Sequence, residues 1–141
     1  MVFNKQNILD NTKMKFETSV DYIDNALYIT NKRLTGEGEY IYHTDTNILE
    51  SIKLQLNYIK NVLIGEEKDK SRLKDIIIGY YAGKELDGND PVFQFFLSSA
   101  FYISRQIDKG VRIKLPHQVS NDYFDRIKKL MNQLPDDFDL P

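Results

Sequence analysis

A short polar turn between two apolar helical patterns constrains the fold of this chain most strongly. The turn reads Asp87-Gly88-Asn89-Asp90-Pro91, and apolar residues recur at helical spacing on both sides of it, between residues 71 and 109. Asp90 is suited to accept a hydrogen bond from the free N–H groups of the second helix, and Pro91 suits the first helical position. The stretch is therefore predicted to be two helices joined by a turn.

The same helical periodicity appears in most of the chain. It predicts an all-α fold, a single compact bundle of about five helices without a β-sheet, over residues 17–34, 46–64, 71–86, 91–109 and 121–134. In the third of these helices, the inward-facing residues are expected to be Leu73, Ile76, Ile77 and Tyr80. We divide the chain into an N-terminal arm at 1–16, for which a short helix and a partly ordered segment are the alternatives, a helical domain at 17–134 and a frayed acidic tail at 135–141.

Composition excludes several classes of protein. The 141 residues suit one domain, and the absence of cysteine leaves neither a disulfide framework nor a thiolate zinc site. The net charge of −2 argues against a nucleic-acid binder driven by bulk charge. We expect no signal peptide and no membrane span, because the N-terminus is polar and no apolar run approaches the ~20 residues that a span needs. A cytoplasmic protein is expected.

Catalytic motifs are few. His43 and His117 lie in no metal-binding pattern, so we expect no metal and no cofactor. The R-x4-H spacing of Arg112 and His117 resembles the active motif of helical HEPN ribonucleases, although Pro116 lies inside it. The carboxylates Glu85, Asp87 and Asp90 cluster in one turn, where capping and solvation compete with acid–base chemistry as explanations.

Two glycines lie on one face of the third predicted helix. Gly79 and Gly83 are four residues apart, and a glycine in a helix interior costs about 1 kcal/mol relative to alanine. The pair indicates close approach of either a neighbouring helix or a partner. A helical adaptor module with some other partner is a separate alternative to an enzyme.

Several segments together resemble a known family. They are Leu54–Leu63, the group Gly79, Ala82, Lys84, Glu85 and Asp87, the Asp90-Pro91 pair, Ala100 and Tyr102, and Gly110 before the link to Pro116. In these positions the chain, from about residue 17 to 116, is similar to small all-helical immunity proteins that neutralise type VI-secreted effectors with NAD(P)-glycohydrolase activity. The N-terminal arm, a linker at 36–43 and the helix after His117 depart from that pattern.

The resemblance implies a non-enzymatic protein that binds a cognate toxin domain as a heterodimer and blocks its active site. It implies no cofactor, no small-molecule substrate, no nucleic acid and no membrane partner. Acidic residues favour association with a positively charged cleft. Tyrosine is enriched in interface hot spots, and Tyr80 is a suitable anchor in addition to the tyrosines named in the next sentence. The predicted toxin-binding residues are Tyr81, Lys84, Glu85, Asp87, Glu37, Glu39, Tyr40 and Tyr42.

Overall fold

The computed structural model describes residues 12–36 and 44–138, and these residues form helices and no strand. The elements are α2 (Ser19–Leu34), α3 (Thr46–Leu63), the 3₁₀ helix η1 (Leu73–Asp75), α4 (Ile78–Lys84), α5 (Pro91–Lys109), α6 (Pro116–Val119), α7 (Tyr123–Gln133) and η2 (Pro135–Phe138), a second 3₁₀ helix. The all-α prediction is confirmed, and the predicted helix 91–109 agrees with α5.

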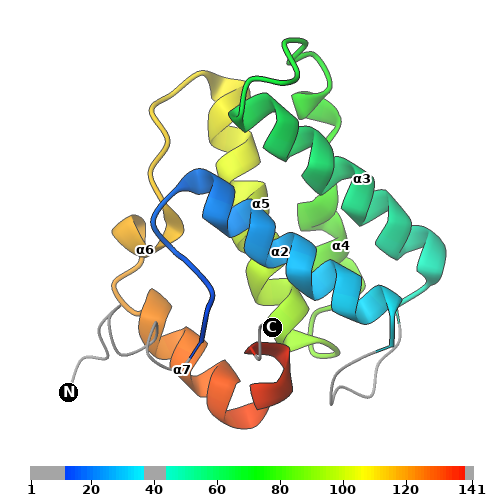
Figure 1. Cartoon of the computed structure of the whole chain (residues 1–141), viewed down its shortest axis with the longest axis vertical. Coiled ribbons are helices and arrows are strands. Elements are labelled where there is room, and N and C mark those ends of the chain that lie inside the picture. Colours follow the sequence, from blue (N-terminus) through cyan, green and yellow to red (C-terminus); the bar gives the residue numbers. More distant parts are fainter. Residues whose placement is uncertain (1–11, 37–43, 139–141) are drawn as a thin grey trace.

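Helix α5 is the centre of the molecule. It contacts α2, α4, η1 and α6, while α3 packs on α2 (Figure 1). Its apolar face is almost fully buried, since Phe93, Phe96, Leu97, Ala100 and Ile103 expose none of their surface. A broad apolar stripe of this kind is what a helix surrounded by other helices requires.

Local capping interactions mark the ends of the main helices. Thr18 and Asp21 form a capping box at the start of α2, and the Asp45 carboxylate accepts from the Asn47 N–H at the start of α3. At α5, the Asp90 carboxylate accepts from the Phe93 N–H at 3.2 Å. Gly110 ends α5 in the left-handed conformation, with φ at 68°, which glycine adopts without steric cost.

The third predicted helix is interrupted. Residues 73–75 form only a 3₁₀ turn, Ile76 is extended, and α4 begins at Ile78. The Gln55 side chain on α3 accepts a hydrogen bond from the Ile77 N–H at 2.7 Å, which replaces a helical carbonyl as the partner. The break shifts the helical phase. Ile77 and Tyr80 are therefore 45% and 59% exposed, and their predicted inward orientation is wrong, whereas Leu73 and Ile76 are buried.

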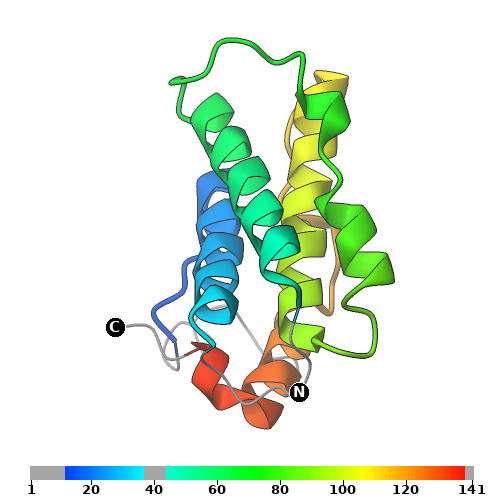
Figure 2. The same cartoon turned by 90° about the vertical axis from the view of Figure 1, so that its right-hand side faces the viewer.

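The described residues nearest to the two ends of the chain, 12–16 and 135–138, pack more tightly than expected. In the described part of the N-terminal arm, Thr12, Met14 and Phe16 are buried. The expected fraying is wrong for residues 135–138, because η2 buries both Asp137 and Phe138, and the Thr12 hydroxyl donates to the Phe138 carbonyl at 2.9 Å. In both Figure 1 and Figure 2, α7 and η2 lie across one end of the bundle.

Candidate functional site

The predicted contact residues at the end of α4 lie close together on the surface. Lys84 and Asp87 are exposed, and Tyr81 and Glu85 are half-buried. The turn that follows is fixed by the N–H groups of Asn89 and Asp90, which donate to the Leu86 carbonyl at 2.9 and 3.0 Å. Leu86 itself is completely buried, so the turn is anchored while its charged side chains face outward.

The Lys84 and Asp87 side chains of this turn do not pair with each other. Among the described residues, the Lys84 ammonium has no hydrogen bond or ion pair, so it does not pair with Asp87. The Asp87 carboxylate accepts from the Gln94 side-chain amide at 3.1 Å, at an exposed position. The Asp90 side chain is buried and caps α5, whereas Asp87 is exposed and Glu85 is half-buried. The three carboxylates therefore do not form one acid–base cluster.

A largely apolar strip is exposed along α4, where the periodicity predicts that Ile77 and Tyr80 face inward, although Tyr80 is also expected to be an interface anchor. Ile77, Tyr80 and Lys84 follow one another at helical spacing, and the Tyr80 ring lies 6.3 Å from that of Tyr81. Leu54 on α3 is 71% exposed and shares the lining of a cavity of about 240 Å³ with Ile77. Only the interruption of the helix at residue 76 exposes this strip, and a continuous periodicity gives no sign of it.

Of the two glycines, only one lies in a close contact. A Cβ atom on Gly79 would lie 2.4 Å from the Phe101 ring of α5, whereas one on Gly83 would meet nothing within 4 Å. Gly79 therefore lets α4 pack against α5, and Gly83 lies on the open side of α4.

The acidic linker is the second predicted contact segment. Its residues Glu37, Glu39, Tyr40 and Tyr42 lie outside the residues that the structure describes.

Arg112 and His117 lie in different surroundings. The His117 Nδ1 shares a hydrogen bond with the buried Tyr22 hydroxyl, and its ring packs at 5.2 Å from Phe124. Arg112 is exposed and lines a shallow cavity of about 410 Å³ whose lining does not include His117. His117 therefore has a structural role in attaching α6 to α2, which does not favour the ribonuclease interpretation.

A buried charge cluster joins three parts of the chain. The Arg33 guanidinium donates to Asp90 at 2.6 and 3.0 Å and to Asp137 at 2.6 and 2.8 Å. Burial alone would lower the pKa of Arg33, but the two carboxylates outweigh it and hold that pKa above its usual value. The sequence analysis missed this cluster, because a basic residue in the last turn of a helix is usually solvated.

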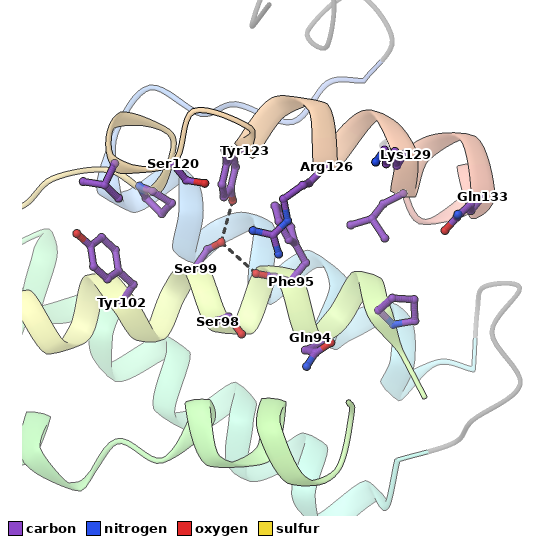
Figure 3. Close-up of a pocket in the computed structure, with 14 residues that line it drawn as sticks. Gln94, Phe95, Ser98, Ser99, Tyr102, Ser120, Tyr123, Arg126, Lys129 and Gln133 are labelled. Carbon is purple, nitrogen blue, oxygen red and sulfur yellow. Dashed lines mark hydrogen bonds between the residues drawn. The ribbon is translucent and has the colours of Figure 1, made fainter. Parts of the chain in front are cut away.

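A larger cavity of about 540 Å³ lies between α5 and the C-terminal helices (Figure 3). The Ser99 and Tyr123 hydroxyls meet at 2.8 Å across its floor, and the Arg126 guanidinium lies 4.9 Å from the centre of the Phe95 ring. Burial raises the pKa of the Tyr123 phenol, and the hydrogen bond with Ser99 opposes this only in part. The cavity is thus bounded by a fixed polar contact and by a cation stacked on an aromatic ring.

Two further searches covered the described part of the chain. No three histidine, aspartate or glutamate side chains there are grouped so that they could hold a metal ion. No helix there has both the length and the apolar character needed to cross a membrane.

Comparison with known proteins gives one consistent result. The Tsi6 family matches residues 18–106. The immune protein Tsi6 of Pseudomonas aeruginosa is 33% identical over 99 residues, which cover 70% of this chain and 99% of that protein. A solved structure of Tse6 in complex with Tsi6 contains a chain matched with a TM-score of 0.63 at 32% identity, over 71% of this chain and all of that one. A structure of Tsi6 from Pseudomonas aeruginosa gives a TM-score of 0.58 at 31% identity, over 71% of this chain and 98% of that one.

Proposed function

This chain belongs to the Tsi6 family of immunity proteins, and from that premise we propose that it binds a cognate toxin domain as a heterodimer and blocks its active site. One observation carries the proposal: the chain matches the whole length of a Tsi6-like chain whose solved structure includes the toxin Tse6. A match over the full relative supports a shared binding role better than a match over one motif would.

We further propose that the protein does this without chemistry of its own. Arg112 and His117, which offered the enzyme alternative, are held in separate surroundings, and the His117 ring is engaged with Tyr22. An inhibitor needs only a stable scaffold and a complementary surface. The scaffold is provided by the helices packed around α5, and the complementary surface has to lie on its exposed side chains.

The toxin contact is proposed at the exposed face of α4 and the turn that follows. Tyr81, Lys84, Glu85 and Asp87 lie there with the apolar strip at Ile77 and Tyr80 beside them. Protein interfaces combine an apolar and aromatic centre with a polar rim, and tyrosines are frequent hot spots. The carboxylates at the rim suit a positively charged cleft, since opposite charges raise the association rate and the specificity.

The resemblance of the sequence suggests what kind of toxin is bound. We propose a secreted toxin that degrades NAD(P), and we place the immunity protein in the cytoplasm, where such a toxin meets its substrate. The phosphates of a dinucleotide need a positively charged or donor-rich cleft, and an acidic surface such as the Glu85–Asp87 turn is complementary to it. The linker with Glu37, Glu39, Tyr40 and Tyr42 stays a second proposed contact segment.

Co-expression tests the proposed function directly. A candidate toxin domain, sought in the reading frame upstream of this gene, is expressed in a bacterial host with and without the chain, and survival, cellular NAD(P) and co-purification are measured. We expect survival, preserved NAD(P) and a one-to-one complex. A complex that forms while the toxin still kills would support the adaptor alternative, and the absence of both binding and protection would overturn the proposal.

A further inference from the structure

We propose that the cavity between α5 and the helices α6 and α7 binds a small organic anion with a flat, aromatic body. Its volume of about 540 Å³ lies in the usual range for small-molecule sites. The proposal concerns a ligand of this protein and does not depend on the proposed toxin, because none of the residues that line the cavity belongs to the predicted contact surface.

The charge of the lining selects an anion. Two cationic side chains, Arg126 and Lys129, contribute to it, and none of its other lining residues is acidic: Pro91, Gln94, Phe95, Ser98, Ser99, Tyr102, Pro116, Val119, Ser120, Tyr123, Leu130 and Gln133. In the part of the chain that the structure describes, neither cation forms an ion pair or a hydrogen bond. Their positive charge is therefore available to a ligand.

Arg126 is held in an orientation that suits this role. Its guanidinium lies 4.9 Å from the centre of the Phe95 ring, and Figure 3 shows it reaching from α7 toward α5. A guanidinium that lies over an aromatic ring contacts the ring with its face. The N–H groups at its edge stay able to donate to a carboxylate, sulfonate or phosphate. The stacking restricts the side chain before a ligand arrives, which lowers the entropy cost of binding.

The remaining lining suits an aromatic body. Figure 3 places Tyr102 and Ser120 toward one end of the cavity and Lys129 and Gln133 toward the other, with Arg126 between them. Tyr102 and Val119 are 37% and 51% exposed, so apolar surface is uncovered at the end away from Lys129. A flat ligand would place its ring there and its anionic group beside the two cations.

The family model matches one wall of the cavity and stops before the other. Helix α5 lies within the segment matched by the family up to residue 106, whereas α6 and α7 lie beyond it. The relatives are matched over 98–100% of their length by about seven-tenths of this chain, so the remainder has no counterpart in them. The Ser99–Tyr123 hydrogen bond of 2.8 Å and the Phe95–Tyr123 ring contact of 4.7 Å fix α7 on α5. The α6 and α7 side of the cavity therefore lies outside the segment that the family model matches.

A fluorescent probe of matching chemistry tests the proposal. The dye 8-anilinonaphthalene-1-sulfonate carries an anionic sulfonate on a flat naphthalene ring, and its fluorescence rises on binding. We expect saturable binding to the folded wild-type protein at one site. Removing both charges with Arg126→Gln and Lys129→Gln should weaken it at least about tenfold, since hydrogen bonds to charged groups are lost.

The matched control removes two charges elsewhere. Lys70 and Lys74 are exposed and do not line the cavity, so Lys70→Gln with Lys74→Gln should leave the dissociation constant within about twofold. Ser98, an exposed residue on the α5 wall, offers an independent variant: Ser98→Phe fills the cavity and should abolish saturable binding with the fold intact by circular dichroism.

A second probe tests whether binding needs the anionic group or only the aromatic rings. N-phenyl-1-naphthylamine is the same dye without the sulfonate, and we expect it to bind at least about tenfold more weakly. Equal affinity for both dyes, equal binding by the wild type and the Arg126–Lys129 variant, or no saturable binding by the wild type would each overturn the proposal. Toxin neutralisation by the same variant is measured separately, so a failure of one proposal is not mistaken for a failure of the other.

Discussion

The Arg33 guanidinium and the Asp137 carboxylate form a two-pronged ion pair, with N–O distances of 2.6 and 2.8 Å, although they are 104 residues apart in the sequence. Their side chains are 2% and 0% exposed. Arg33 also donates to Asp90, the residue that caps α5. One guanidinium thus connects α2, the start of α5 and the C-terminal 3₁₀ helix.

The first prediction concerns the removal of Asp137. The substitution Asp137→Ala leaves a buried cation with one carboxylate where it had two, and breaking a buried pair in this way costs about 3 kcal/mol. The measurement is the free energy of unfolding in urea. Asp136→Ala is the matched control: that neighbour is exposed, and we expect a change within about 0.5 kcal/mol. A loss below about 1 kcal/mol for Asp137→Ala would mean that η2 contributes little to the fold.

The second prediction contrasts the two glycines of α4. Gly79→Ala places a Cβ atom 2.4 Å from the Phe101 ring, so α4 must move away from α5, and we expect a loss of about 1–3 kcal/mol. Gly83→Ala meets nothing within 4 Å and should instead stabilise the protein by up to about 1 kcal/mol, because alanine favours a helix. Thermal unfolding of both variants measures whether each substitution lowers or raises the stability. Equal effects would show that contact with Phe101 does not determine the choice of glycine.

Local signals explain which parts of the fold the sequence could predict. The cap at Asp90 and the stop at Gly110 depend on neighbouring residues only, and both are confirmed. The break at Ile76 depends on a side chain from another helix, Gln55, and the burial of Asp137 depends on Arg33, so neither can be read from a local pattern.

The candidate site divides in the same way. Lys84, Glu85 and Asp87 could be grouped from sequence because they lie within four successive residues, and their contact with a toxin stays a prediction. The large cavity could not be predicted, because its walls come from helices α5 and α7, which meet only in the folded chain.

The third prediction concerns stability at alkaline pH. Burial raises the pKa of the Tyr123 phenol, so as the pH rises above about 10 the unfolded chain loses this proton while the native state keeps it. The contribution of this pKa difference to the free energy of unfolding is therefore complete below about pH 10. Above that value it should fall by up to about 1.4 kcal/mol per pH unit. Urea unfolding between pH 9 and about 11.5 measures the slope, which we expect to be shallower for Tyr123→Phe.

The control for this slope keeps the phenol but removes its partner. Ser99→Ala loses the hydrogen bond to Tyr123 and should be less stable at neutral pH by about 1 kcal/mol, with an alkaline slope at least as steep as that of the wild type. An identical slope in Tyr123→Phe and in the wild type would show that Tyr123 loses its proton in the folded state as readily as in the unfolded one.

The last prediction locates the toxin contact. Glu85→Lys with Asp87→Lys reverses two charges in a turn whose backbone is fixed by the buried Leu86, so we expect the melting temperature to change little. If the turn lies in the interface, like charges now face the toxin cleft, and the affinity should fall by more than about 2 kcal/mol, roughly thirtyfold. Calorimetric titration against the toxin domain measures this.

The same change of charge in Glu66→Lys with Asp122→Lys, at exposed positions outside the proposed contact, should have a much smaller effect. Unchanged affinity in the Glu85–Asp87 variant, with the fold intact, would move the proposed contact to the linker that carries Glu37, Glu39, Tyr40 and Tyr42.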